Sequence, residues 1–232
     1  MYKKRPNTLY CFSPPVMIAT MAIEVALAII TIFRKKSPLK NIASITLILL
    51  AVFQLAEYLV CRSYPGLDSV LVSKTGFVAI TLLPPLGIHT ANIIAKRQHN
   101  WSIYASYLLA VGFIGYFVFV PDSIVASICT GNYIIFNFAS GAGMAYSVYY
   151  FTLLGCLLAL TLYLAATQKQ NNLKKAQGLL ALGALSFLIP TAVFYLIFAQ
   201  TTSSIPSVMC GFAVIYAVIL TFGVVPLCKE SK

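Results

Sequence analysis

The chain has 232 residues, of which 60% are hydrophobic and 9% are charged, and its mean hydropathy is +0.89. A soluble domain carries roughly 25% charged residues, so this composition excludes an ordinary soluble globular fold and predicts a membrane protein. The formal net charge of +11 comes from short Lys and Arg clusters between apolar runs. This pattern is typical of topology signals and of contact with anionic membrane lipids, and it argues against a nucleic-acid-binding surface.

Seven apolar runs follow one another along the chain, each close to the ~20 residues that a helix needs to cross a bilayer. The helices are expected at residues 13–33, 42–61, 75–95, 101–120, 144–166, 177–198 and 206–227. No repeat of fixed period and no linker to a soluble domain interrupts them. We therefore predict an all-α, polytopic membrane bundle of seven transmembrane helices, with residues 1–232 as a single integral membrane domain.

The first apolar run raises the question of a signal peptide. The apolar core of a signal peptide is only about 7–15 residues long and ends at a small-residue cleavage site. This run is longer, contains Glu24 and ends in Arg34-Lys35-Lys36. We expect a retained first helix, with Pro14 and Pro15 in its first turn, where proline is tolerated.

The longest connection, residues 121–143, lies between the fourth and fifth expected helices. Its middle, Tyr133–Phe138, is rich in aromatic and β-branched residues, and Gly131 and Gly141 flank it. This composition favours a short hairpin. A re-entrant segment is the alternative, which is allowed only where protein or water satisfies the backbone.

The distribution of Lys and Arg predicts the orientation in the membrane. If the N-terminus lies outside and the C-terminus in the cytoplasm, eleven of the 16 basic residues lie on the inner side and five on the outer side. The bias of positive charge toward the cytoplasm favours this orientation, although the basic N-terminus opposes it. The inner group is Arg34, Lys35, Lys36, Lys40, Lys96, Arg97, Lys169, Lys174, Lys175, Lys229 and Lys232.

Four of the six cysteines fall near the predicted outer face, namely Cys11, Cys61, Cys129 and Cys210. A disulfide among them is one interpretation, because the outside of a bacterial inner membrane is oxidising. A bridge from Cys129 to a helix end would hold the long loop down. The other interpretation is that they are buried thiols that pack as small hydrophobic groups. Four cysteines allow three connectivities, and the sequence does not choose among them.

Five polar residues inside the apolar runs are the candidate ligand or ion pathway: Glu24, Gln54, Glu57, His89 and Asn92. Glu24 lies in the middle of the first run, and Gln54 and Glu57 lie three residues apart on one face of the second. Ionisable groups at membrane depth are energetically unfavourable, so each one is a hypothesis of function. Pro84 and Pro85 precede His89 and free helix carbonyls near Ile80 and Thr81, which can bind a cation, a water or a hydroxyl.

Three functions compete for these residues, against a fourth interpretation in which the bundle simply satisfies each group. A proton or ion path suits carboxylate and imidazole groups on neighbouring helices. A metal site of Glu24, Glu57 and His89 is disfavoured, because the helical rise separates Glu57 from His89 by about 15 Å, and no metal is predicted. A pocket for a small amphipathic molecule would be walled by tyrosines, such as Tyr146, Tyr149 and Tyr195.

Several activities can be set aside. No Lys lies clearly inside a span, as retinal bound through a Schiff base would require in a protein of the microbial rhodopsin type. Two His in all are too few for bis-histidine haem or for a zinc hydrolase like the alkaline ceramidases. A nucleophile elbow, a P-loop, a dinucleotide fingerprint and a Cys-x-x-Cys pair are missing from the sequence. We assign no catalytic residue and no cofactor.

Four short motifs together resemble a family of bacterial seven-helix integral membrane proteins to which no activity is assigned. They are Cys11-Phe-Ser-Pro14, Phe53-Gln-Leu-Ala-Glu-Tyr58, Thr81-Leu-Leu-Pro-Pro-Leu-Gly-Ile-His89 and Tyr149-Tyr150-Phe151. The resemblance implies a fold and a home in the bacterial plasma membrane, and it supplies no catalytic residues.

The leading hypothesis is a small transporter or a protein that translocates ions or protons, using Glu24, Gln54, Glu57 and His89. The alternatives are a membrane-embedded enzyme or sensor, with an outward-facing pocket for a lipid-like ligand beneath the loop around Cys129, and a structural membrane component. The expected partners are membrane lipids and a small molecule or ion. The oligomeric state is not predicted.

Overall fold

The computed structural model describes residues 14–34, 37–62, 66–97, 100–129, 134–139, 141–198 and 204–228. Its helices are α1 (Pro14–Ile32), α2 (Lys40–Arg62), α3 (Ser69–Thr81), α4 (Leu83–Ile94), α5 (Trp101–Phe119), α6 (Ala142–Thr167), α7 (Asn171–Phe198), α8 (Ile205–Val218) and α9 (Val225–Leu227). A 3₁₀ turn covers Pro121–Ser123, and a π-helical segment, Ile219–Val224, joins α8 to α9. The strands are β1 (Ile124–Cys129) and β2 (Ile134–Phe138).

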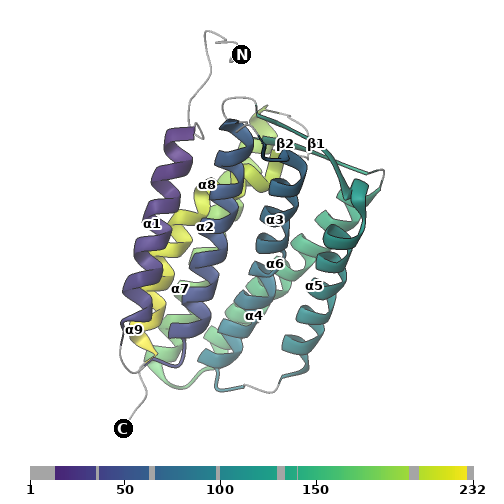
Figure 1. Cartoon of the computed structure of the whole chain (residues 1–232). Coiled ribbons are helices and arrows are strands. Elements are labelled where there is room, and N and C mark those ends of the chain that lie inside the picture. The colour runs from purple at the N-terminus through teal and green to yellow at the C-terminus, as the bar shows by residue number, and fades with distance from the viewer. Residues whose placement is uncertain are drawn as a thin grey trace.

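Seven helical spans among the described residues are long and apolar enough to cross a membrane. The helices α3 and α4 together form the third span, and α8 continues through the π segment and α9 to form the seventh. The spans run side by side as a bundle (Figure 1). The helical fold class and the seven predicted long apolar helices are therefore confirmed, and these helices are compatible with a polytopic membrane bundle.

Two spans begin earlier than the apolar pattern predicts. The third starts at Ser69 rather than at residue 75, because the side chain of Asp68 accepts a hydrogen bond from the backbone N–H of Val70 and caps the helix there. The sixth, formed by α7, starts at Asn171 rather than at residue 177. The first turns of this helix are polar, so the hydropathy pattern does not predict them.

The predicted hairpin is present. Strands β1 and β2 pair antiparallel, from Ile124 opposite Phe138 to Cys129 opposite Ile134, with an irregularity between Ile124 and Ala126. The side chains of Ile134 and Phe136 are buried while that of Asn137 is exposed, which is the alternation expected of a strand with one covered face. The hairpin lies across one end of the bundle (Figure 1).

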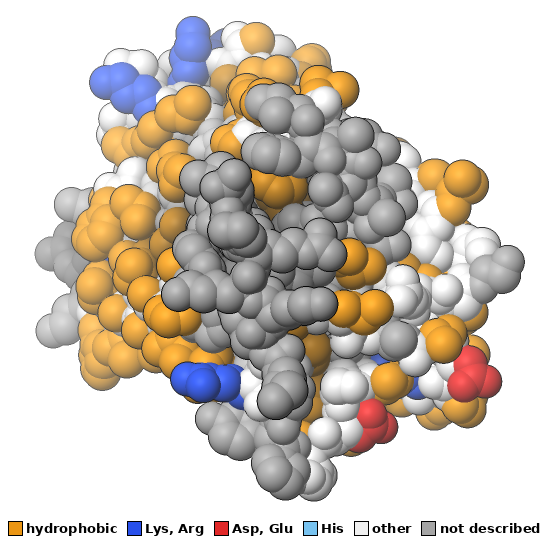
Figure 2. Space-filling model, turned by 90° about the horizontal axis from the view of Figure 1, so that it is seen from above, with side chains coloured by type: hydrophobic (Ala, Val, Ile, Leu, Met, Phe, Trp, Pro, Cys, Tyr) orange, Lys and Arg blue, Asp and Glu red, His pale blue; other side chains and the backbone are white. Residues whose placement is uncertain are grey.

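This end, which we call the hairpin end, also holds the α2–α3 connection and the start of α8 (Figure 1). Figure 2 views it from above and shows hydrophobic side chains with few charged ones among the coloured groups. We call the opposite end the basic end, because seven described basic residues lie there and no described acidic residue does. They are Arg34, Lys40, Lys96, Arg97, Lys169, Lys174 and Lys175.

An aromatic cluster fixes the hairpin to the bundle. The ring of Phe77 on α3 lies 4.9 Å from that of Phe136 on β2, 5.4 Å from that of Phe117 on α5 and 5.5 Å from that of Tyr146 on α6, measured between centroids. The contacts of Phe77 with Phe136 and Tyr146 are edge-to-face, a geometry that adds to the gain from burying the rings. The cluster therefore connects the hairpin with three helices.

Candidate functional site

Glu24 belongs to the one face of α1 that is turned into the bundle. The buried residues of α1 lie on one face of the helix, with the spacing of three or four positions expected there. They are Met17, Thr20, Glu24, Leu27, Ala28 and Thr31. This face packs against α2 and α8. The side chain of Glu24 is 0% exposed, so its carboxyl group lies between these helices rather than toward the outside of the bundle.

Gln54 and Glu57 lie one turn apart on α2, and each is 2% exposed. Glu57 is close enough to Glu24 for the two carboxyl groups to interact electrostatically. The structure thus brings together two acidic side chains that are 33 positions apart in the sequence.

The polar atoms of this group are poorly satisfied. Both carboxyl oxygens of Glu24, one oxygen of Glu57 and the amide nitrogen of Gln54 are buried and have no hydrogen-bond partner among the described residues. Buried polar atoms are hydrogen-bonded in the great majority of cases, so an orphaned set calls for an explanation. The interpretation that the bundle satisfies each group does not fit Glu24, Gln54 or Glu57.

Ser207 on α8 is a hydrogen-bond partner of Glu57. Its hydroxyl donates to the Glu57 carboxyl group, and its oxygen accepts a hydrogen bond of 3.2 Å from the backbone N–H of Ile134. Cys210, one turn further along α8, lies within electrostatic range of both Glu57 and Glu24. The site therefore has walls from α1, α2 and α8.

We call Ser207, Glu57, Gln54 and Glu24 the polar column, because they lie at successive depths below the hairpin end. Ser207 is two residues into α8, Glu57 and Gln54 are five and eight residues before the end of α2, and Glu24 is ten residues into α1. With a rise of 1.5 Å per residue, their depths are about 3, 8, 12 and 15 Å. The column reaches from the hairpin end to the middle of the bundle.

His89 and Asn92 are not part of this column. Both belong to α4, in the half of the third span nearer the basic end. The ring nitrogen Nδ1 of His89 is 3.2 Å from the Tyr107 hydroxyl. Asn92 donates to the carbonyl of Ile88 and accepts from Asn100, at 2.9 and 3.0 Å, which joins α4 to the start of α5. Half-buried His89 and buried Asn92 thus both have polar partners.

The break between α3 and α4 at Leu82 follows from Pro84 and Pro85. The Thr81 carbonyl, which an amide at position 85 would bond in a continuous helix, accepts a 2.7 Å hydrogen bond from the Tyr149 hydroxyl. The hydroxyl of Thr81 donates to the Phe77 carbonyl, so the Tyr146 hydroxyl, 3.1 Å away, is the donor to Thr81. A hydroxyl is thus the partner of the freed Thr81 carbonyl, one of the three predicted alternatives.

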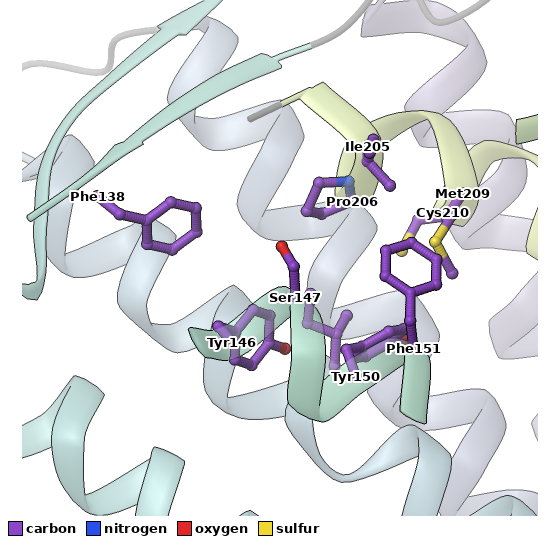
Figure 3. Close-up of a pocket in the computed structure, with 10 residues that line it drawn as sticks. Phe138, Tyr146, Ser147, Tyr150, Phe151, Ile205, Pro206, Met209 and Cys210 are labelled. Atoms are coloured by element: carbon purple, nitrogen blue, oxygen red, sulfur yellow. The ribbon is translucent and has the colours of Figure 1, made fainter. Parts of the chain in front are cut away.

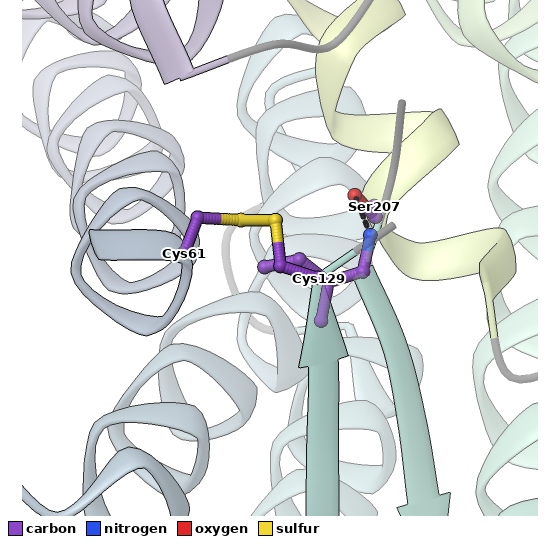
Figure 4. Close-up of a disulfide and its surroundings, with 4 residues drawn as sticks. Cys61, Cys129 and Ser207 are labelled. Carbon is purple, nitrogen blue, oxygen red and sulfur yellow. Dashed lines mark hydrogen bonds between the residues drawn. A yellow bond between two sulfur atoms is a disulfide. The ribbon is translucent and has the colours of Figure 1, made fainter. Parts of the chain in front are cut away.

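Of the four cysteines considered for a disulfide, two form one. Cys61 at the end of α2 and Cys129 at the end of β1 form a disulfide (Figure 4), with their Cα atoms 5.3 Å apart. Cys210 is a buried free thiol. Cys11 lies outside the described residues.

Two adjoining cavities lie beside α8, and Cys210 lines both of them. The one beneath the hairpin has mainly aromatic and aliphatic walls (Figure 3), encloses about 450 Å³ of space including its open mouth, and is lined by Ile80, Phe138, Tyr146, Ser147, Tyr150, Phe151, Ile205, Pro206, Met209 and Cys210. The second continues toward Tyr216 and shares Tyr150, Met209 and Cys210 with the first. Tyr149 lines neither cavity, and the side chain of Tyr195 lies outside the described part of the chain.

Sequence reasoning missed two polar residues. Ser207 is a serine in the first turn of a helix after a proline, a position where serine is common and signals no function. The apolar pattern predicts Gln177 as the start of a span, but it lies two turns inside α7 and donates from its amide nitrogen to the Ala91 carbonyl at 2.7 Å. Its buried amide oxygen has no hydrogen-bond partner among the described residues. Only the tertiary structure shows what either residue contacts.

Neither a comparison of the chain with models of known protein families nor a comparison with curated proteins finds a match.

Proposed function

We propose that this protein is a multi-pass protein of the bacterial inner membrane that translocates protons or a small cation, with Glu24 and Glu57 as the groups that take up the positive charge. The observation that carries the proposal is the pair of buried carboxyl groups, of which three oxygens have no hydrogen-bond partner within the described part of the chain. The proposal also includes the predicted orientation, with the hairpin end and the N-terminus outside.

The chemistry of the pair supports uptake of positive charge. Two carboxylates in an apolar interior repel each other, and each one is strongly disfavoured when it has neither a basic partner nor a full set of hydrogen bonds. The described Lys and Arg residues lie toward the two ends of the bundle rather than beside Glu24. A proton or a cation is therefore what the pair lacks.

The depth of the polar column supports transport rather than a purely structural role. Glu57 is near the hairpin end and Glu24 near the middle, with the amide of Gln54 between their depths. A charge that enters at the hairpin end and reaches Glu24 by way of Glu57 would cover about 15 Å, roughly half of the ~30 Å hydrocarbon core. His89 and Asn92 are left out of the path, since both are engaged elsewhere.

The test is flux in proteoliposomes. The purified protein is reconstituted with a pH-sensitive dye inside, a pH gradient or a gradient of Na⁺ or K⁺ is imposed, and the rate of internal pH change is followed. The rate for wild type should exceed the rate for protein-free vesicles. Glu24→Gln should reduce this difference in rate at least about tenfold, which corresponds to about 1.4 kcal/mol in the barrier.

Asp122→Asn is the matched control, because it also removes one carboxylate but at an exposed position near the hairpin. It should retain the wild-type rate. Equal rates in wild-type, Glu24→Gln and protein-free vesicles, under all of the gradients, would overturn the proposal.

A second candidate function rests on the cavity beneath the hairpin. Phe138, Tyr146, Tyr150 and Phe151 give it aromatic walls suited to a small amphipathic ligand. Native mass spectrometry of the purified protein should then detect a bound molecule that Ser147→Phe displaces. Gly155→Phe on the same helix should retain it, because a Cβ atom at position 155 would lie in open space, with no neighbouring atom of another part of the structure within 4 Å, and Gly155 does not line the cavity. Identical spectra for the two variants would count against this function.

A further inference from the structure

Cys129 and Ile134 face each other in the last residue pair of the β1–β2 ladder, and each of them is attached to a helix of the bundle (Figure 4). The disulfide ties Cys129 to Cys61 on α2, and the backbone N–H of Ile134 donates to Ser207 on α8. One strand end is therefore fixed covalently and the other by a hydrogen bond, to two helices that both line the polar column.

Both attachments lead to Glu57. Cys61 lies one helical turn beyond Glu57 on the same face of α2, at a spacing of four residues. Ser207 bonds the Glu57 carboxyl group directly. Glu57 is 2% exposed although it is only five residues from the end of its helix, which agrees with a covering element at this end.

The remainder of the hairpin is held differently. Ile124 and Phe136 are buried, and the hydroxyl of Ser127 is 2.7 Å from that of Ser73 on α3. These contacts fix the hairpin to α3 and to the aromatic cluster, at a distance along the ladder from Cys129. They can persist while the Cys129–Ile134 pair moves.

We propose that the Cys129–Ile134 pair is a redox-sensitive latch that closes the hairpin end of the polar column, and that reduction of the Cys61–Cys129 disulfide opens the column at Glu57. The inference rests on the proposed function only for what would pass through the column. The opening of the latch is a separate property that can be measured without any flux.

The redox step needs a dithiol reductant. Two electrons and two protons pass from the dithiol to the Cys61–Cys129 bond, which becomes two thiols while the reductant becomes a cyclic disulfide. Both cysteines are half-buried at the hairpin end rather than fully enclosed, so the reductant has access to them. The Ile134–Ser207 hydrogen bond and apolar contacts then remain to hold the pair.

The experiment labels carboxyl groups with a water-soluble carbodiimide and glycine ethyl ester, on the full-length protein in nanodiscs. One sample is oxidised, and the other is reduced with dithiothreitol and alkylated. Peptide mass spectrometry then gives the extent of amide formation at each acidic residue. Labelling of Glu57 should rise at least fivefold on reduction, while exposed Asp122 changes less than twofold and serves as the internal standard.

Two variants test the two attachments of the latch separately. The double variant Cys61→Ser, Cys129→Ser should show the high Glu57 labelling without reductant and no further rise with it. Ser207→Ala should raise labelling in the reduced sample above that of reduced wild type, because the second attachment is also lost. Equal Glu57 labelling in oxidised and reduced wild type would overturn the latch, whatever the double variant does.

Flux in oxidised and reduced proteoliposomes separates the two proposals. Increased Glu57 labelling without flux in either state would leave the latch standing and overturn translocation. Flux that is the same in both states, with unchanged labelling, would leave translocation standing and overturn the latch.

Discussion

At the scale of single residues, burial does not distinguish the polar groups of this protein, because Glu24, Glu57, Thr81 and Asn92 are all at most 2% exposed. What distinguishes them is whether their atoms have partners. Asn92 and Thr81 are bonded within the bundle, whereas Glu24 has no partner for either oxygen among the described residues. Glu24 is therefore a stronger candidate for a functional residue than Asn92, although both side chains are buried.

Ser207 is a residue whose loss leaves two buried groups unsatisfied. Ser207→Ala removes the donor to the Glu57 carboxyl group and the acceptor for the Ile134 N–H. Leaving a buried polar group without a partner costs about 1–3 kcal/mol, so thermal unfolding of the purified protein should show a clear loss of stability. Ser186→Ala removes only a bond to a carbonyl of its own helix and should stay within about 0.5 kcal/mol of wild type. Equal stability of the two variants would contradict the role given to Ser207.

Tyr149→Phe tests the hydroxyl at the break. The substitution deletes only the oxygen that donates to the Thr81 carbonyl. A buried hydrogen bond contributes about 1 kcal/mol, and a carbonyl left unpaired raises the loss. Thermal denaturation should therefore be shifted downward by Tyr149→Phe and left in place by Tyr163→Phe, which alters an exposed tyrosine of the same helix.

At the scale of elements, the apolar pattern predicts the seven spans and the hairpin, and it fails where another force decides. Hydropathy predicts a helix that begins near residue 75. It does not predict the N-cap at Asp68, because of which α3 begins six residues earlier. Pro84-Pro85 indicates the break, yet the donor to Thr81 comes from Tyr149, 68 positions away. The π segment Ile219–Val224 has no signal that the sequence analysis used.

The sequence likewise does not determine which cysteines form the disulfide. The sequence places Cys61 and Cys129 near one face of the membrane, but the choice among connectivities depends on the hairpin, which brings the end of β1 to the end of α2. Pairing is a property of the tertiary arrangement and is not carried by the spacing of cysteines.

Removing this disulfide should destabilise the protein substantially. Its two cysteines are 68 positions apart, and closing a loop of that length restricts the unfolded chain by about 4 kcal/mol in the loop-entropy model. The double variant Cys61→Ser, Cys129→Ser should therefore unfold at a markedly lower temperature or denaturant concentration. Cys156→Ser, at an exposed free cysteine, is the control that should leave the transition unchanged.

At the scale of the whole molecule, charge separates the two ends of the bundle. The basic end has seven described Lys and Arg residues, whereas the hairpin end has Arg62 and Lys74 together with Asp68 and Asp122. Positive residues flanking spans are retained on the cytoplasmic side of a bacterial inner membrane. The difference between the ends supports the proposed orientation, with the disulfide on the oxidising side.

A pair of cysteine substitutions tests this orientation. Asp122→Cys and Lys169→Cys are both exposed and lie at opposite ends of the bundle. In intact cells, a membrane-impermeant maleimide should label the first and not the second, and permeabilised cells should show labelling of both. The reverse result in intact cells would place the hairpin end in the cytoplasm.

The interruption at Leu82 gives the third span a joint at mid-depth. Above it, α3 is tied to the hairpin side through Ser73 and through Lys74, whose amine donates to the carbonyls of Val120 and Pro121. Below it, α4 is anchored to α7 through the bond from Gln177 to Ala91. A continuous rod would carry any tilt of its upper part to its lower end, whereas two short rods meeting at Leu82 can pivot. Rearrangement near the disulfide can thus be absorbed before it reaches the half of the bundle nearer the basic end.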